Sequence, residues 1–222
     1  MIDTTAARRA LSLFADILEY PSSGLHDSVQ ECCTLVSDLS PDSAAELRRF
    51  QTFIEGMSPG RLEEFYSQIF DLNAVCHPYV GYHLFGESYK RSAFLVELKE
   101  RFRASDFTYS NTELPDRLSI MLRYLATKGD AGSNGEIIAE GMIPALRMMT
   151  NEVDVTEADP EEKRTKLWDM FSEPQFKDDK PKFQPNAYQH VLRALRALLE
   201  RSVVSEPVAV VAGSLTGDSA DV

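Results

Sequence analysis

The stretch that decides the fold class is Ala7-Arg-Arg-Ala10-Leu11-Ser-Leu-Phe14-Ala-Asp-Ile17-Leu18, close to the start of the chain. Its apolar residues recur every three or four positions, which is the spacing that gathers side chains on one face of an α-helix. Polar cap candidates at residues 3–5 precede it, and Tyr20-Pro21 ends the pattern. The stretch therefore predicts an amphipathic helix.

The same spacing recurs outward from this stretch along most of the chain. Helical stripes cover residues 25–36, 47–57, 62–70, 93–102, 118–125, 137–149, 167–171 and 188–198. Serine followed by proline at Ser40-Pro41 and Ser58-Pro59 is typical of a helix start, because serine caps and proline suits the first turn. Pro144 lies inside its stripe and predicts a kink or break near residue 143.

The segments between the stripes complete the predicted organisation. Residues 129–135 are rich in glycine and predict a loop, and residues 172–186 predict a long exposed loop. The only β-branched run, residues 203–211, is too isolated to build a sheet. We therefore predict an all-α fold, with a single-domain bundle of roughly eight to ten helices over residues 1–202 and an acidic, disordered tail over residues 203–222.

Composition limits the class of protein and of partner. The chain has 222 residues, of which 43% are hydrophobic and 26% are charged, and these values are ordinary for a globular domain. Its net charge is -12, which argues against nucleic acid as a partner because phosphate binding needs a basic face. A basic or apolar peptide is the partner that this charge favours.

Cysteine usage and hydropathy predict the compartment. Three cysteines, at Cys32, Cys33 and Cys76, do not form a disulfide framework, so a reducing compartment is expected. Asp16 and Glu19 interrupt the first apolar stretch, which therefore does not resemble a signal peptide. No apolar run approaches the roughly 20 residues that span a bilayer. The sequence predicts a cytoplasmic protein that does not insert into a membrane.

Motifs for catalysis or cofactor binding are missing from the sequence. There is no nucleophile elbow and no phosphate-binding glycine loop, so no catalytic residue and no cofactor is predicted. Cys76, His77 and His83 form the only arrangement that suggests a metal. The two histidines are six residues apart, and this is not the spacing that places two ligands on one helical face. A metal- or cofactor-dependent enzyme using these three residues is kept as an alternative.

The least ordinary segment is Asp71-Leu-Asn-Ala-Val-Cys-His-Pro-Tyr-Val-Gly-Tyr-His-Leu-Phe-Gly-Glu87, which is dense in aromatic and turn-forming residues. Over the wider segment of residues 66–91, aromatic rings with polar tips and bends at proline and glycine suit a surface that binds a peptide. A helix junction packed beneath neighbouring helices is the alternative interpretation of the same composition.

Several blocks of the sequence resemble one known family. They are Tyr66-xxx-Phe70-Asp71, Pro78-Tyr-Val-Gly-Tyr-His-Leu-Phe-Gly-Glu-Ser-Tyr-Lys-Arg91, Glu113-Leu-Pro-Asp-Arg-Leu118, and the shorter Leu18-Glu-Tyr-Pro21, Ile138-Ala-Glu-Gly-Met-Ile-Pro-Ala-Leu146 and Asn186-Ala-Tyr188. Their order over residues 10–200 is similar to that in the NarJ/TorD family of redox-enzyme maturation chaperones. Within it, the chain resembles chaperones of nitrate reductases and of type II dimethyl-sulfoxide-reductase enzymes. Arg91-Ser92 departs from the Arg-Gly typical of the former group.

The resemblance implies a one-domain helical chaperone that binds the N-terminal leader region of a molybdoenzyme's catalytic subunit. It implies help with molybdenum-cofactor insertion and assembly, contact with cofactor-insertion proteins, and retention of twin-arginine clients until they are assembled. The residues expected to bind the client peptide are Tyr66, Phe70, Asp71, His77, Pro78, Tyr79, Tyr82, His83, Phe85, Gly86, Glu87, Lys90, Arg91, Glu113, Pro115 and Asp116.

The expected mode of binding is a client helix in an apolar groove lined by Tyr66, Phe70, Tyr79, Tyr82 and Phe85. Acidic side chains at positions 71, 87 and 116 would meet the basic residues of the leader. His83 would make the affinity depend on pH, because an imidazole titrates near neutrality. A permanent structural subunit of the reductase is a further alternative to the chaperone.

Overall fold

The computed structural model describes residues 5–72, 76–110, 112–127, 131–150 and 187–204. All of the regular elements in these ranges are helices, and the single β-feature is an isolated bridge between Tyr79 and Arg117. The predicted all-α fold is therefore confirmed.

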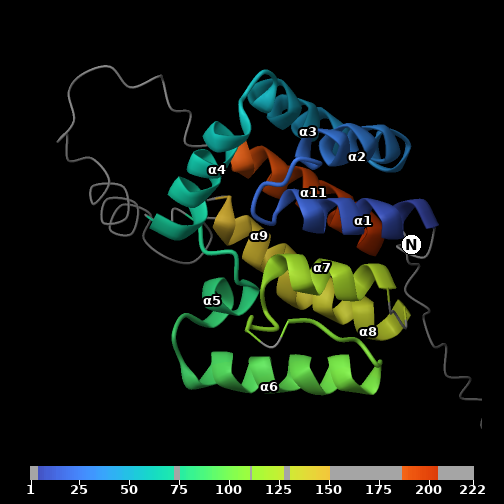
Figure 1. Ribbon diagram of the computed structural model, residues 1–222. Coiled ribbons are helices and arrows are strands. Elements are labelled where there is room, and N and C mark those ends of the chain that lie inside the picture. The colour runs from blue at the N-terminus through green and yellow to red at the C-terminus, as the bar shows by residue number, and fades with distance from the viewer. Residues whose placement is uncertain (1–4, 73–75, 111, 128–130, 151–186, 205–222) are drawn as a thin grey trace, which may run out of the picture.

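One end of the molecule is a bundle of four long helices, α1 (Thr5–Ile17), α2 (Leu25–Leu39), α3 (Pro41–Ile54) and α11 (Ala187–Val204). α1 packs against α2, α2 against α3, and α3 against α11, so the last described helix closes onto the third (Figure 1). Ser40 begins α3 as predicted, because its hydroxyl accepts the Ser43 N–H at 3.4 Å and Pro41 takes the first turn.

An aromatic cluster fills the centre of the core. Tyr188 of α11 is surrounded by rings from three other elements, with ring-centroid distances of 5.0 to 5.8 Å to Phe50, Phe65, Tyr66 and Phe70. Phe65 and Tyr66 belong to α4 (Pro59–Ser67), and Phe70 belongs to the π-helix η1 (Gln68–Leu72) that continues it. The cluster therefore joins the four-helix bundle to the chain that leads toward α5.

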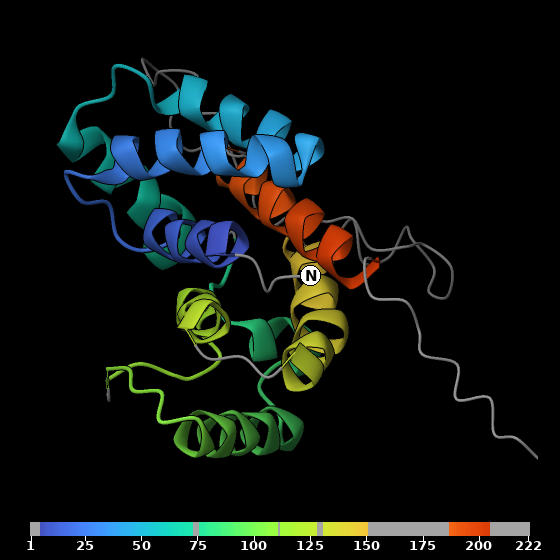
Figure 2. The same cartoon turned by 90° about the vertical axis from the view of Figure 1, so that its right-hand side faces the viewer.

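The other end of the molecule contains α5 (Val80–Phe85), α6 (Tyr89–Ala104) and α7 (Leu118–Thr127). α7 packs against α1 and so connects this end to the bundle, whereas α6 packs against α5 at the outer edge. Figures 1 and 2 show α6 at the extreme opposite to α2 and α3.

The predicted break near Pro144 is present. The π-helix η2 (Ile137–Met142) gives way to α9 (Ile143–Met149), and Pro144 lies in the first turn of α9 where its missing N–H is tolerated. The predicted loop over residues 129–135 is wrong for residues 131–135, which belong to α8 (Ala131–Glu136). The segment continues directly into η2, and Arg101 of α6 pairs with Glu136 at 2.8 Å at the end of α8.

Some predicted features lie outside the described residues. These are the helix around Trp168, the loop at residues 172–186 and the tail beyond Val204, so the single domain with a disordered tail stays a prediction. α11 continues to Val204, so its last two residues lie within the predicted tail. Within the described part of the chain, no helix has the length and apolar character needed to cross a membrane.

Candidate functional site

The aromatic segment around α5 is fixed by its backbone to the turn that precedes α7. The Val80 N–H donates to the Asp116 carbonyl oxygen at 2.8 Å, and the Leu118 N–H donates to the Pro78 carbonyl oxygen at 2.8 Å. These bonds form the bridge between Tyr79 and Arg117. The two blocks that carried the family resemblance are therefore adjacent in space, and they make a rigid base for α5.

A buried ion pair lies beneath this base. The Asp116 side chain is fully buried, and its Oδ2 accepts the Arg91 Nε–H at 3.1 Å, while Oδ1 has no partner among the described residues. Burial raises the pKa of Asp116, and Arg91 opposes that rise. The Arg91 guanidinium also lies over two rings, 5.6 Å from the Tyr79 centroid and 5.7 Å from the Tyr82 centroid.

Glycine is required at position 81 because the backbone of α5 approaches this ion pair closely. A Cβ added there would lie 2.8 Å from Asp116 Oδ2 and 2.9 Å from Phe94 Cδ1. Both distances are too short for carbon in contact with these atoms. Gly81 thus lets α5 lie directly on the ion pair.

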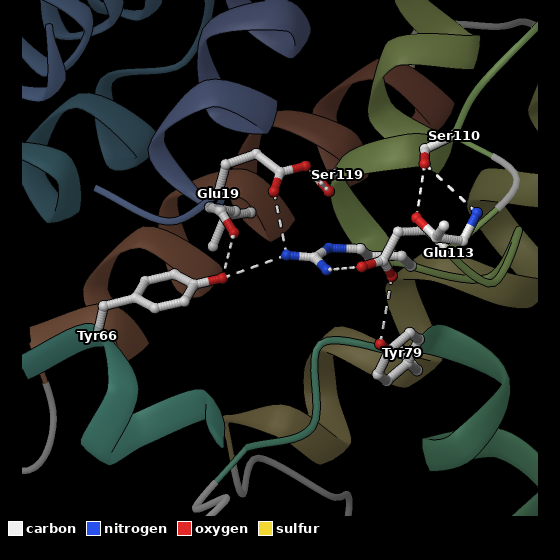
Figure 3. Close-up of polar contacts among 9 residues, drawn as sticks. Glu19, Tyr66, Tyr79, Ser110, Glu113 and Ser119 are labelled. Atoms are coloured by element: carbon white, nitrogen blue, oxygen red, sulfur yellow. Dashed lines mark hydrogen bonds and ion pairs between the residues drawn. The ribbon is translucent and has the colours of Figure 1, made fainter. Parts of the chain in front are cut away.

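A second polar network connects the α5 base to the four-helix bundle (Figure 3). Arg117 donates to Glu113 Oε1 at 2.8 Å and to Glu19 Oε2 at 3.0 Å. Glu19 also accepts the Ser119 hydroxyl at 2.7 Å, and the Tyr79 hydroxyl donates to Glu113 Oε2 at 3.4 Å. Burial disfavours the charge on Arg117, but Glu19 and Glu113 outweigh it, so the pKa of Arg117 is raised.

A cavity of about 470 Å³ opens beside this network. Its lining combines apolar and charged side chains from α1, α7 and the segment between α6 and α7: Ser12, Glu19, Phe107, Thr108, Tyr109, Ser110, Glu113, Arg117, Ile120, Arg123 and Thr127. Two acidic and two basic residues are included, so the cavity has no strong net charge. Tyr79 reaches its edge through the hydrogen bond to Glu113.

Two of the predicted groove residues lie in the core in this structure. Tyr66 is 2% exposed and Phe70 is 6% exposed, and both pack on Tyr188. Burial raises the pKa of Tyr66 to about 12, and its hydroxyl donates to the Leu18 carbonyl oxygen at 3.3 Å. The expectation that these two rings line an open groove is therefore corrected, because their surfaces are buried against neighbouring helices.

The acidic residues expected to meet the leader also differ from one another. Asp116 is buried against Arg91 and cannot face a ligand in this conformation, so that part of the expectation is corrected too. Asp71 and Glu87 are exposed, at the end of η1 and after α5. Glu113 is half-buried in the Arg117 network, and Pro115 is buried in the turn.

The remaining predicted residues form a partly exposed surface on α5 and at the start of α6. Tyr82, His83 and Phe85 are half-buried, and Lys90 is exposed. Gly86 ends α5 with φ of 60°, a conformation that favours glycine. The His77 ring packs against that of Tyr82 in a tilted arrangement, with 4.2 Å between ring centroids. This surface is where the predicted aromatic, basic and acidic groups come together.

His83 is poorly placed to titrate at neutral pH. Its Nε2 lies 2.8 Å from the His77 carbonyl oxygen, and burial lowers the pKa of His83. The ring is therefore expected to be neutral near pH 7, with its protonation displaced to the acid side of the ordinary histidine range.

Arg117 and Glu19 are the site residues that sequence reasoning missed. Both lie inside blocks that carried the resemblance, Glu113–Leu118 and Leu18–Pro21, but they are 98 residues apart. No local spacing indicates that they meet. The sequence signal that could have pointed to them is that each block contains a charged residue.

The cysteines show no features of a metal or nucleophile site. Among the residues that the structure describes, no group of three or more His, Cys, Asp or Glu side chains could hold a metal ion. Burial raises the pKa of Cys76 to about 12, so the Cys76 thiol stays protonated.

Thiol reactivity tests this description. Cys32, Cys33 and Cys76 are free and buried, so the native protein is expected to resist Ellman's reagent at about pH 8, whereas urea should expose all three thiols. A Cys76→Ser variant provides the matched control, because its urea titration should lose one thiol. Rapid reaction of one thiol in the native protein would contradict the assignment.

Comparison with known proteins agrees with this architecture. Residues 37–152, more than half of the chain, match the family described as "Nitrate reductase delta subunit". The "Probable nitrate reductase molybdenum cofactor assembly chaperone NarJ" of Bacillus subtilis (strain 168) is 29% identical over 126 residues, which cover 56% of this chain and 68% of that protein.

A second relative is the "Nitrate reductase molybdenum cofactor assembly chaperone NarJ" of Escherichia coli (strain K12), 29% identical over 119 residues. The match covers 52% of this chain and half of that protein. The predicted resemblance to NarJ-type proteins is confirmed by these relatives and by the matched family. The chain therefore belongs to the nitrate reductase delta subunit family.

Proposed function

We propose that this protein is an assembly chaperone for the molybdenum-containing catalytic subunit of a nitrate reductase or a related reductase. It binds the N-terminal segment of that subunit in the cytoplasm and releases it after cofactor insertion. The family and the two relatives described as assembly chaperones support this role, and they support the expectation that the chain is not itself an enzyme.

The observation that carries the proposed binding site is the contrast within α5. Its backbone is fixed to the turn before α7, and Gly81 and Val80 are buried, yet Tyr82, His83 and Phe85 keep part of their surface exposed. A rigid backbone presenting half-exposed rings binds a peptide at low entropic cost, because few side-chain rotations are lost. The client segment therefore lies across α5.

Charge fits a basic client segment at one edge of this surface. Glu87 and Asp71 are exposed, while Asp116 is neutralised by Arg91. The attraction of a basic leader then comes from the two exposed acids and from the net charge of -12, and added salt should slow the association. A twin-arginine leader of a type II enzyme is one client of this chemistry.

Calorimetry with the client's N-terminal peptide tests the site. Tyr82→Ala combined with Phe85→Ala should weaken binding by at least about tenfold, because truncated aromatic anchors are typical hot spots. Val96→Ala is the matched control, since Val96 is an exposed apolar residue on the outer side of α6. Equal affinity of the double variant and the wild type would refute the α5 site.

A permanent structural subunit remains the second candidate, because the matched family is described as a subunit. The two roles differ in the composition of the finished enzyme. If the chain is a chaperone, the purified mature reductase should contain none of it, whereas a structural subunit would be present in fixed proportion.

A further inference from the structure

Among the described residues, α6 packs on the rest of the protein along one face. Leu98 and Phe102 are each 1% exposed, and the Phe102 ring lies 4.6 Å from that of Tyr124 on α7. Phe94 meets Phe85 of α5 at 5.6 Å between ring centroids. No described helix covers the opposite face, which forms the outer edge of the molecule in both views (Figures 1 and 2).

That outer face carries an apolar stripe. Tyr89 is 87% exposed and Val96 is 56% exposed, and they are the two most exposed large hydrophobic residues in the described chain. They are seven residues apart, so they lie on the same side of the helix, about 10 Å apart along its axis. The exposed small residues Ser92 and Ala93 lie between them. This is the pattern of one seam of a pair of packed helices.

Exposed charges of both signs flank the stripe, with the positive ones in excess. Glu97 is paired with Arg101, and Glu100, four residues after Val96, lies in line with the stripe. Lys90, Lys99 and Arg103 are exposed, and none of them makes an ion pair with another described residue. The other two basic residues of α6, Arg91 and Arg101, are already paired with carboxylates. α6 contains five basic and two acidic residues, which give it a charge of +3, against -12 for the whole chain.

We infer that the outer face of α6, defined by Tyr89, Val96, Lys90, Lys99 and Arg103, docks an acidic amphipathic helix of a partner protein. An apolar ridge of that helix would pack on Tyr89 and Val96 while its flanking Asp and Glu side chains meet the three free cations. A basic leader is repelled by the same face. This surface is therefore distinct from the proposed client-peptide site on α5.

Other occupants fit the observations less well. A second copy would bring a net charge of -12 onto a chain of the same charge. An anionic membrane surface would likewise repel the chain as a whole. Two exposed apolar side chains also provide little area for membrane insertion.

A designed peptide provides the test. The probe is an 18-residue helix with leucine along one heptad seam and glutamate beside it, and its matched control has lysine in place of every glutamate. With the full chain, any binding of the basic peptide belongs to the proposed α5 site and should not change when α6 is substituted. Calorimetry should also detect binding of the acidic peptide. Lys99→Glu with Arg103→Glu should weaken that binding at least about tenfold, as should Tyr89→Ser with Val96→Ser.

These substitutions are all on exposed side chains, so far-ultraviolet circular dichroism and urea unfolding should match the wild type. The charge-reversed variant should also keep full affinity for the client's N-terminal peptide, and this separates the α6 surface from the α5 site. If the α5 substitutions leave the affinity for the client peptide unchanged while the acidic peptide still binds, the result would contradict only the proposed function.

Several results would overturn the inference. They include no binding of the acidic peptide and unchanged binding of the acidic peptide by the charge-reversed variant. A wild-type dimer that the variant abolishes in sedimentation would assign the face to a second copy, and variant-sensitive binding to vesicles of anionic phospholipid would assign it to a membrane. If the acidic peptide binds only after the acidic residues between 152 and 162 have been replaced by neutral ones, the α6 face would be assigned to that segment of the same chain.

Discussion

Replacing Arg91 by methionine is expected to lower the free energy of unfolding by about 3–5 kcal/mol, because it leaves the Asp116 carboxylate buried without its cation. Methionine keeps most of the side-chain volume, so the loss reports mainly the charge. Asp116 is fully buried and Arg91 is 14% exposed, so water cannot replace the missing partner without local opening. Urea unfolding of the full chain measures the effect.

The sign of the pH dependence follows from Asp116. Burial raises its pKa, and loss of Arg91 removes the influence that lowers it, so the pKa should rise further in the variant. A carboxyl whose pKa is higher in the folded than in the unfolded state favours folding below the unfolded pKa, and loses that contribution as pH rises through the folded pKa. The stability deficit of Arg91→Met should therefore be largest near about pH 8 and smaller near about pH 5.

Two further variants make this result specific. Arg61→Met removes a surface pair with Glu64, whose side chain is 52% exposed, and should change stability by less than about 1 kcal/mol. Adding Asp116→Asn to Arg91→Met removes the titrating group, so the difference from wild type should lose its acid-side recovery. An Arg91→Met protein as stable as the Arg61→Met control would show that the buried pair is not important for folding.

Gly81→Ala is the second substitution with a large expected effect, a loss of about 1–3 kcal/mol in unfolding free energy. The new methyl group would lie 2.8 Å from Asp116 Oδ2 and 2.9 Å from Phe94 Cδ1, and 3.3 Å from Arg91 Cγ. None of these neighbours is the flexible tip of an exposed side chain. Asp116 is buried, Phe94 packs on Phe85, and Arg91 is held by its ion pair and by the two tyrosine rings. α5 must therefore shift away from its base.

A shifted α5 should also lose affinity for the client peptide, because Tyr82 and Phe85 move with it. Gly60→Ala is the matched control: Gly60 is exposed in the first turn of α4, and an added Cβ there meets nothing within 4 Å. That variant should be as stable as wild type, or slightly more stable. If the two alanine variants unfold at the same urea concentration, the close approach at Gly81 is not a constraint.

The helices were predictable because the spacing of apolar residues within each one shows which of its faces is buried. A helix with one buried face needs apolar residues every three or four positions, and the stripes of α1, α2 and α3 satisfy that rule locally. α8 was missed because residues 131–136 include two glycines, which lower helix propensity and favour a loop. Nothing in their spacing indicates that the helix continues into η2.

The site was only partly predictable, for a physical reason. Composition showed that residues 66–91 hold more aromatic residues than a buried helix needs, but rings packed on Tyr188 and rings facing solvent have the same spacing in the sequence. Tyr66 and Tyr82 were therefore placed on one surface, although Tyr66 is buried and Tyr82 is half-exposed. The junction interpretation was correct for the former, and the surface interpretation stays a prediction for the latter.

The position of Tyr188 has a consequence for the order in which the chain can fold during synthesis. The rings of Phe50, Phe65 and Phe70 pack around a residue made more than a hundred positions later than the first of them. When α1 to α4 have left the ribosome, Tyr188, the ring at the centre of this aromatic cluster, has therefore not yet been made. Closing so long a loop is slow, because the entropy is lost before the contacts form. An emerging chain would expose these rings until α11 arrives, so this protein should itself be prone to aggregation while it is being made.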